Sequence, residues 1–179
     1  RGSMYKIHND NLLIHGCVPM NMFGEFVSVN VDGKQLKGRA YLDYVEKIAK
    51  EGYFEPEGSA KKKYGEDFLW YLWCGKNSPI FCKDKMKTFE RYYLAEKETW
   101  EEIKNPFYTF QDDERIADKV LREFGIEPDL GHIICGHMPV KFKAGESPLK
   151  ANGKLFIIDR WFVKSIPKNY WYSRIYIKI

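Results

Sequence analysis

Three short, continuous apolar runs constrain the fold of this 179-residue chain more than any other feature. They cover residues 12–14, 133–135 and 155–158, and polar residues, glycine or histidine follow each of them. Such runs are typical of strands that are buried on both faces of a sheet. Helical patterns lie between the runs, so we expect an α/β or α+β sandwich rather than a helix bundle.

The remaining strand signals lie in the first part of the chain. Residues 5–7 and 11–15 are expected to form the first strands. Residues 25–31 alternate between apolar and polar side chains and are followed by Asp32-Gly33, a common turn pair. This pattern predicts a strand that ends in a tight turn.

Two stretches carry apolar residues at helical spacing. Residues 39–51 present one such face, and Gly52 is placed to end that helix. Residues 112–124 give the clearest pattern, with Asp112 as the expected N-cap and Gly125 as the stop. Residues 84–93 have mixed helical character.

Other segments have no clear period. The charged residues 55–66 include a proline and a glycine, which predicts a mobile surface loop. The aromatic residues 68–73 are expected to form a pocket wall or, more simply, part of the core. Residues 141–153 predict a further loop that carries lysine, glycine and proline.

Composition limits the classes of function. A net charge of +4, from 29 Lys and Arg against 25 Asp and Glu, is too mild and dispersed for a nucleic-acid binder, whereas anionic small molecules remain suitable ligands. The four cysteines show no CxxC spacing and are expected to be reduced thiols. No apolar run approaches the roughly 18 residues of a membrane span, so we expect a soluble, cytoplasmic protein.

Two histidines follow apolar runs and lie next to glycines. His15 comes directly after the first run, and His137 follows the second run by way of Gly136. Strand ends fix the backbone rigidly, which suits metal-ligating side chains, and glycine lets the backbone and a metal-bound phosphate come close. The alternative is that each histidine is a hydrogen-bonded structural residue.

The surroundings of these histidines resemble a known superfamily. The segments LLIHGCVPMN (residues 12–21) and IICGHMPVK (residues 133–141) resemble the last two histidine motifs of the calcineurin-like metallophosphoesterases. The stretches WYLWCG, KMKTFERY and GESP between or just after them are similar to class III fructose-1,6-bisphosphatases in particular. The likeness extends from about residue 4 to residue 159.

The resemblance implies a β-sandwich flanked by helices and a Mn²⁺-dependent phosphatase that hydrolyses fructose 1,6-bisphosphate to fructose 6-phosphate and phosphate in gluconeogenesis. His15 and His137 would then be ligands of one metal ion of a dinuclear centre. Arg91, Lys141 and Lys143 are the residues we expect to contact substrate phosphate, the alternative being ordinary solvated surface charges.

The chain also departs from that superfamily. Its early motifs, Asp-x-His, Gly-Asp-x-x-Asp and Gly-Asn-His-Glu, which supply the other ligands, are absent from the sequence. We therefore interpret residues 4–159 as the C-terminal part of a larger enzyme, preceded by a tag remnant at residues 1–3. We expect this part alone to be inactive and to bind Mn²⁺ poorly, with the N-terminal part of the same enzyme as its partner; a homo-oligomer stays open.

The tail, residues 160–179, departs a second time. The resemblance requires Gly-Gly after Asp159, but Arg160 and Trp161 stand there. Removing the first base of the Arg160 codon restores a glycine-containing ending, so we hypothesise a frameshift, with ordinary divergence of a terminus as the alternative. A rival interpretation of the whole chain is a non-catalytic regulatory or assembly module with structural histidines.

Overall fold

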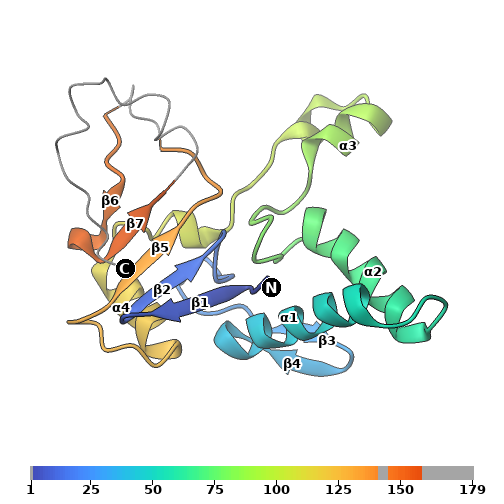
Figure 1. Ribbon diagram of the computed structural model, residues 1–179. Coiled ribbons are helices and arrows are strands. Elements are labelled where there is room, and N and C mark those ends of the chain that lie inside the picture. The colour runs from blue at the N-terminus through green and yellow to red at the C-terminus, as the bar shows by residue number, and fades with distance from the viewer. Residues whose placement is uncertain (1, 141–144, 159–179) are drawn as a thin grey trace, which may run out of the picture. The chain divides into compact units, whose positions relative to one another are not determined.

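A computed structural model describes residues 2–140 and 145–158, which group into two compact units (Figure 1). We call them the helical unit and the sheet unit, and describe each by itself. The helical unit comprises Arg1–Met4 and Gly16–Phe110, and the sheet unit comprises Tyr5–His15 and Gln111–Ile179.

The sheet unit is built on one five-stranded mixed sheet with the order β1-β2-β5-β7-β6. The three apolar runs form its central strands β2, β5 and β7, which are mutually parallel, while β1 and β6 pair antiparallel at the edges. The strands are β1 (Tyr5–His8), β2 (Asn11–Ile14), β5 (His132–Cys135), β6 (Leu149–Lys150) and β7 (Leu155–Ile157). The mixed sheet and its helices confirm the predicted α/β class.

Helix α4 (Glu114–Glu123) packs beside this sheet, and its buried side chains include Val120 and Leu121. The expected cap at Asp112 was wrong by one residue. The N-cap is Asp113, whose Oδ1 accepts the backbone N–H of Arg115 at 3.0 Å, because the helix begins at Glu114, one residue later than the sequence pattern predicts. Gly125, with φ +74°, ends the helix as predicted.

The helical unit contains a hairpin of α1 (Gly38–Phe54) and α2 (Ala60–Cys74). The prediction that Gly52 ends the first helix was wrong, since α1 continues to Phe54. Gly52 instead meets Gly65 of α2, where an added Cβ on Gly65 would lie 2.3 Å from the Gly52 Cα. The two glycines therefore let the helix backbones touch.

The prediction of a mobile loop over residues 55–66 was wrong for its second half, where α2 begins at Ala60. Ser59 caps this helix, because its Oγ accepts the backbone N–H of Lys62 at 3.1 Å. The aromatic stretch that follows is only partly core: Phe68 is buried, whereas Trp70 and Trp73 are 61% and 50% exposed.

A two-stranded sheet of β3 (Val29–Val31) and β4 (Lys34–Leu36) lies in the same unit. The predicted strand at residues 25–31 is thus shorter, and the Asp32-Gly33 turn is confirmed by a positive φ at both residues. Hydrogen bonds from the hydroxyls of Tyr44 and Tyr64, both 2.7 Å long, hold the pKa of Asp32 below its usual value. Asp32 therefore ties this turn to both helices of the hairpin.

Short helices complete the described chain. They are α3 (Lys87–Tyr93) and the 3-10 turns η1 (Lys97–Trp100), η2 (Pro106–Tyr108) and η4 (Ala151–Gly153). Asn105 anchors η2 from a buried position, since its Oδ1 accepts the N–H groups of Phe107 and Met20 at 3.0 and 3.1 Å.

Two sequence predictions, one about the tail and one about a β-sandwich, are not tested by the described residues. The tail at residues 160–179, together with the segment 141–144, lies outside the described residues. The β-sandwich implied by the metallophosphoesterase resemblance stays a prediction, because the structure shows a mixed sheet with helices and nothing finer. Among the described helices, none combines the length and apolar character that crossing a membrane requires.

Candidate functional site

The carboxyl ends of the three parallel strands meet at one edge of the five-stranded sheet. Ile14 of β2 pairs with Cys135 of β5, and Cys135 pairs with Ile157 of β7. The residues that follow these three positions therefore emerge side by side. In open α/β sheets this edge is where ligands bind.

His15 and His137 come together at this edge. His15 Nε2 lies 3.2 Å from His137 Nδ1, and the two rings meet edge to face with centroids 5.0 Å apart. His15 is exposed and His137 is half-buried. The sequence predicted these two residues as partners in one site, and the structure brings them together although 122 positions separate them.

The backbone around the pair is tightly held. The N–H of Gly136 donates to the carbonyl oxygen of His15 at 3.0 Å, which continues the β2–β5 pairing past both strands. His137 then adopts φ +66°, a left-handed conformation that costs energy for a residue with a side chain. The chain turns sharply there, immediately after the residue that is bonded to His15.

The glycines beside the two histidines have close neighbours. Their role in leaving room for a metal-bound phosphate stays a prediction. An added Cβ on Gly136 would lie 2.9 Å from the carbonyl oxygen of Ile158. A Cβ on Gly16 would lie 2.4 Å from Cys82 Sγ. Both glycines are therefore required by close packing within the protein itself.

The donor geometry suits one edge of a metal coordination sphere. Two ligands that are each about 2.1 Å from a metal ion, in tetrahedral or octahedral positions, lie about 3.0–3.4 Å apart. The observed 3.2 Å falls in this interval. Within the described parts of the chain, however, no group of three or more His, Cys, Asp or Glu side chains is placed to hold an ion. The pair fits a metal, but only as two of its ligands.

The predicted substrate-contacting residues are not assembled in the described structure. Arg91 belongs to the helical unit, where its exposed guanidinium lies 5.4 Å from the ring centroid of Trp100 in a cation–π contact. Lys141 and Lys143 lie outside the described residues. The sequence did not indicate a role for Trp100, because no periodic pattern links this residue to Arg91 across the irregular segment after α3.

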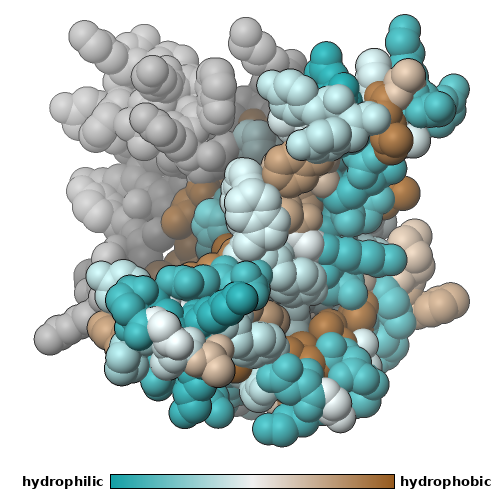
Figure 2. Space-filling model, turned by 90° about the vertical axis from the view of Figure 1, so that its right-hand side faces the viewer, coloured by the Kyte–Doolittle hydropathy of each residue, from teal (hydrophilic) through white to brown (hydrophobic). Residues whose placement is uncertain are grey.

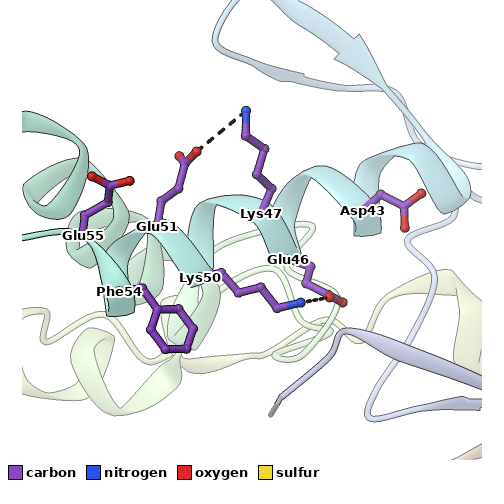
Figure 3. A pocket seen from close by; sticks show the side chains of 7 residues that line it. All are labelled: Asp43, Glu46, Lys47, Lys50, Glu51, Phe54 and Glu55. Atoms are coloured by element: carbon purple, nitrogen blue, oxygen red, sulfur yellow. Dashed lines mark hydrogen bonds and ion pairs between the residues drawn. The ribbon is translucent and has the colours of Figure 1, made fainter.

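A shallow concavity elsewhere carries no comparable chemistry. It runs along α1 and is lined by four acidic side chains, two lysines and one phenylalanine (Figure 3). Its lysines are paired one turn away, Lys47 with Glu51 at 3.8 Å and Lys50 with Glu46. The two lysines are thus paired along one helix, and two further carboxylates face solvent, so the concavity is an ordinary solvated helix face.

A mixed sheet with two histidines at the carboxyl ends of neighbouring parallel strands defines an α/β protein with a candidate ligand site at its sheet edge. Comparison with known proteins identifies the family within this class. The family profile described as Firmicute fructose-1,6-bisphosphatase matches residues 1–170, and the chain belongs to this family.

The curated relatives are named fructose-1,6-bisphosphatase class 3. The protein from Clostridioides difficile (strain 630) is 50% identical over 168 residues, which are 94% of this chain and 25% of that protein. The protein from Clostridium novyi (strain NT) is 47% identical over 165 residues, 92% of this chain and again 25% of the relative. The chain thus spans about a quarter of the length of these relatives. No solved structure matches it.

Proposed function

We propose that this chain forms part of a metal-dependent phosphatase that hydrolyses fructose 1,6-bisphosphate to fructose 6-phosphate and inorganic phosphate in gluconeogenesis, in the cytoplasm. The carrying observation is the 3.2 Å approach of His15 Nε2 and His137 Nδ1 at the strand ends, in a chain whose relatives bear the name fructose-1,6-bisphosphatase. A calcineurin-like sandwich in the longer polypeptide is part of the same proposal.

In this proposal the two imidazoles hold one metal ion, Mn²⁺, from the edge of the sheet. Strands β2 and β5 fix the two backbones, and the Gly136-to-His15 hydrogen bond sets their spacing before any ion arrives. The metal, when bound, supplies Lewis acidity and a more acidic water. Mn²⁺ prefers oxygen ligands, so the carboxylates must come from outside the described residues.

Phosphate recognition would fall to basic side chains. We retain Arg91, Lys141 and Lys143 as the proposed phosphate contacts, because guanidinium and ammonium groups are the usual partners of phosphate oxygens. The cation–π contact of Arg91 with Trp100 holds the guanidinium near the ring without using its N–H donors. Those donors therefore remain available for an anion.

The test compares this chain alone with a chimera in which it replaces the matching segment of the Clostridioides difficile relative. We expect the chimera to hydrolyse fructose 1,6-bisphosphate with Mn²⁺, and the chain alone to release no phosphate and to bind Mn²⁺ only weakly in a calorimetric titration. Turnover by the pure chain would contradict the proposed division of ligands. A folded chimera that binds Mn²⁺ without hydrolysing the substrate would contradict the proposed reaction.

The alternative is a non-catalytic module in which the histidine pair is structural. Its support is that the described residues offer the pair no third ligand. It predicts that replacing either histidine lowers the stability of the chimera and leaves hydrolysis unchanged. The phosphatase proposal predicts the opposite pattern.

A further inference from the structure

Helices α2 and α3 carry a group of exposed aromatic and apolar side chains in the helical unit. Trp70, Trp73, Tyr92 and Tyr93 are 61%, 50%, 80% and 83% exposed, and Leu69 is 40% exposed. With the half-buried Phe89 they form what we call the aromatic surface. Figure 2 faces the side of these helices, and pale and brown side chains form a band there among hydrophilic ones.

The rings of this surface are ordered against one another. Trp70 and Trp73 meet edge to face with centroids 5.0 Å apart, and Phe89 of α3 stacks on Trp70 at 6.3 Å and meets Trp73 at 5.8 Å. Ordered aromatic side chains lose little conformational entropy when a partner covers them. The surface is therefore suited to forming an interface.

Helix α2 has apolar side chains on two faces. Phe68 and Leu72 are buried against the rest of the helical unit, while Leu69, Trp70 and Trp73 point away from it and remain exposed. A surface helix normally has one apolar stripe, and a helix that is apolar on opposite faces is normally covered on both. One covering layer of α2 is thus absent from the described residues of the helical unit.

Helix α3 shows the same deficit more strongly. It has seven residues, none of them buried. An isolated helix of this length is unstable in water. Within the helical unit, the described contacts of α3 are ring contacts to α2, packing against η1 and a hydrogen bond from the Lys87 backbone N–H to Glu102 Oε1 at 3.0 Å. Its exposed Tyr92 and Tyr93 extend the aromatic surface.

We propose that another segment of the longer family polypeptide, from the part that has no counterpart in this chain, packs on the aromatic surface. This chain corresponds to a quarter of its relatives, so about three quarters of such a polypeptide must find contacts, some of them with this quarter. Large, ordered aromatic side chains of this kind are typical anchors of interfaces between two parts of one polypeptide. The inference does not depend on the reaction that the protein catalyses.

Hydroxyl-radical footprinting of the chain and of the chimera tests this inference, with an added reporter peptide to normalise the radical dose. We expect oxidation of Trp70 and Trp73 to be at least fivefold slower in the chimera. Equal oxidation rates would overturn the proposal. Protection that develops in the isolated chain as its concentration rises would also overturn it, because a second copy would then be the occupant.

A double variant and a control variant distinguish the loss of contacts with the covering segment from a loss of stability of this chain itself. We expect Trp70→Ser with Trp73→Ser to lower the unfolding midpoint of the chimera and to leave that of the isolated chain within about 2 °C, because the removed rings touch mostly each other and Phe89. Phe23→Ser, which removes a still more exposed ring outside the surface, is the control and should change neither midpoint. The proposal is contradicted if the double variant loses as much in the isolated chain as in the chimera, or if the chimera loses as much with Phe23→Ser.

If the chimera does not fold, hydrogen exchange of the native Clostridioides difficile protein gives the decision. The segment that aligns with α2 and α3 should exchange at least tenfold more slowly in the whole protein than in its isolated matching quarter. Equal exchange in the two forms would overturn the proposal.

Discussion

The two ends of strand β5 place a histidine beside the neighbouring strand β2 in the same way but with different chemistry. At the carboxyl end, His137 meets His15 at 3.2 Å, and at the amino end His132 Nδ1 lies 3.1 Å from Asn11 Oδ1. Asn11 Nδ2 donates to the carbonyl oxygen of Asn9 at 2.7 Å, so its Oδ1 is the atom that faces His132. The amide oxygen accepts and the ring nitrogen donates.

The two pairs differ in the atoms that meet. The His132 ring donates to the amide oxygen of Asn11, and it also packs against Phe156 with centroids 5.4 Å apart. Between His15 and His137 two ring nitrogens meet, so either one ring donates an N–H to the lone pair of the other or a metal ion lies between two lone pairs. In the proposed function the carboxyl end of β5 binds a cation, whereas the amino end contributes to stability.

The largest expected effect is a loss of activity when a histidine at the carboxyl end of β5 is replaced. In the chimera, His15→Ala or His137→Ala should lower kcat/KM for fructose 1,6-bisphosphate at least about a hundredfold, because each removes one of the proposed metal ligands. His8→Ala, at the exposed end of β1, is the control and should retain activity. Phosphate release measured over a range of Mn²⁺ concentrations gives the comparison. A loss that excess Mn²⁺ restores fully would place the histidines in metal affinity alone.

Replacing the glycines that flank β5, Gly131 before it and Gly136 after it, should lower the free energy of unfolding by different amounts. An added Cβ on Gly131 would lie 2.2 Å from Ile126 Cγ2 and 2.5 Å from the carbonyl oxygen of Asp10, so Gly131→Ala should cost about 2–3 kcal/mol. On Gly136 the nearest atom is at 2.9 Å, so Gly136→Ala should cost about 1–2 kcal/mol. Urea unfolding measures both, and the reverse order would contradict this assignment of strain.

The sequence predicted the parts of the fold that depend on local pattern. Three apolar runs became three parallel strands, and Gly125 ended α4, because each signal lies within a few neighbouring residues. The pairing of His15 with His137 was also predictable, since parallel strands end at one edge.

The failures have a common cause in contacts between distant residues. Gly52 has the sequence of a helix stop but is held within α1 by Gly65, thirteen residues away in another helix. No pattern in the sequence marks that contact. Likewise no pattern in the sequence indicates the close approach of Gly136 to Ile158, because the two are neighbours only in the folded sheet.

At the amino end of β5, His132→Ala should lower the free energy of unfolding by about 1–2 kcal/mol, because the Asn11 hydrogen bond and the packing on Phe156 are both lost. Hydrolysis by the chimera should change little. A double-mutant cycle with Asn11→Ala should give a coupling energy of about 1 kcal/mol between the two side chains. Zero coupling would show that the ring packing alone matters.

The smallest expected effect concerns the backbone of His137, whose φ of +66° suits glycine better than any residue with a side chain. Both His137→Ala and His137→Gly remove the imidazole, so both should abolish its contact with His15. His137→Gly should nevertheless be more stable than His137→Ala by about 1 kcal/mol, because only glycine adopts this conformation without strain.

Urea unfolding of the two variants side by side measures that difference, and equal stabilities would mean that the turn relaxes when the ring is removed. With the difference present, the histidine occupies a position where its backbone is strained and its side chain touches the other predicted ligand. Strain of this kind persists where surrounding structure enforces it, and the Gly136-to-His15 hydrogen bond is the constraint next to it. The carboxyl end of β5 would then give up stability to aim a ring, while the amino end gains stability from one.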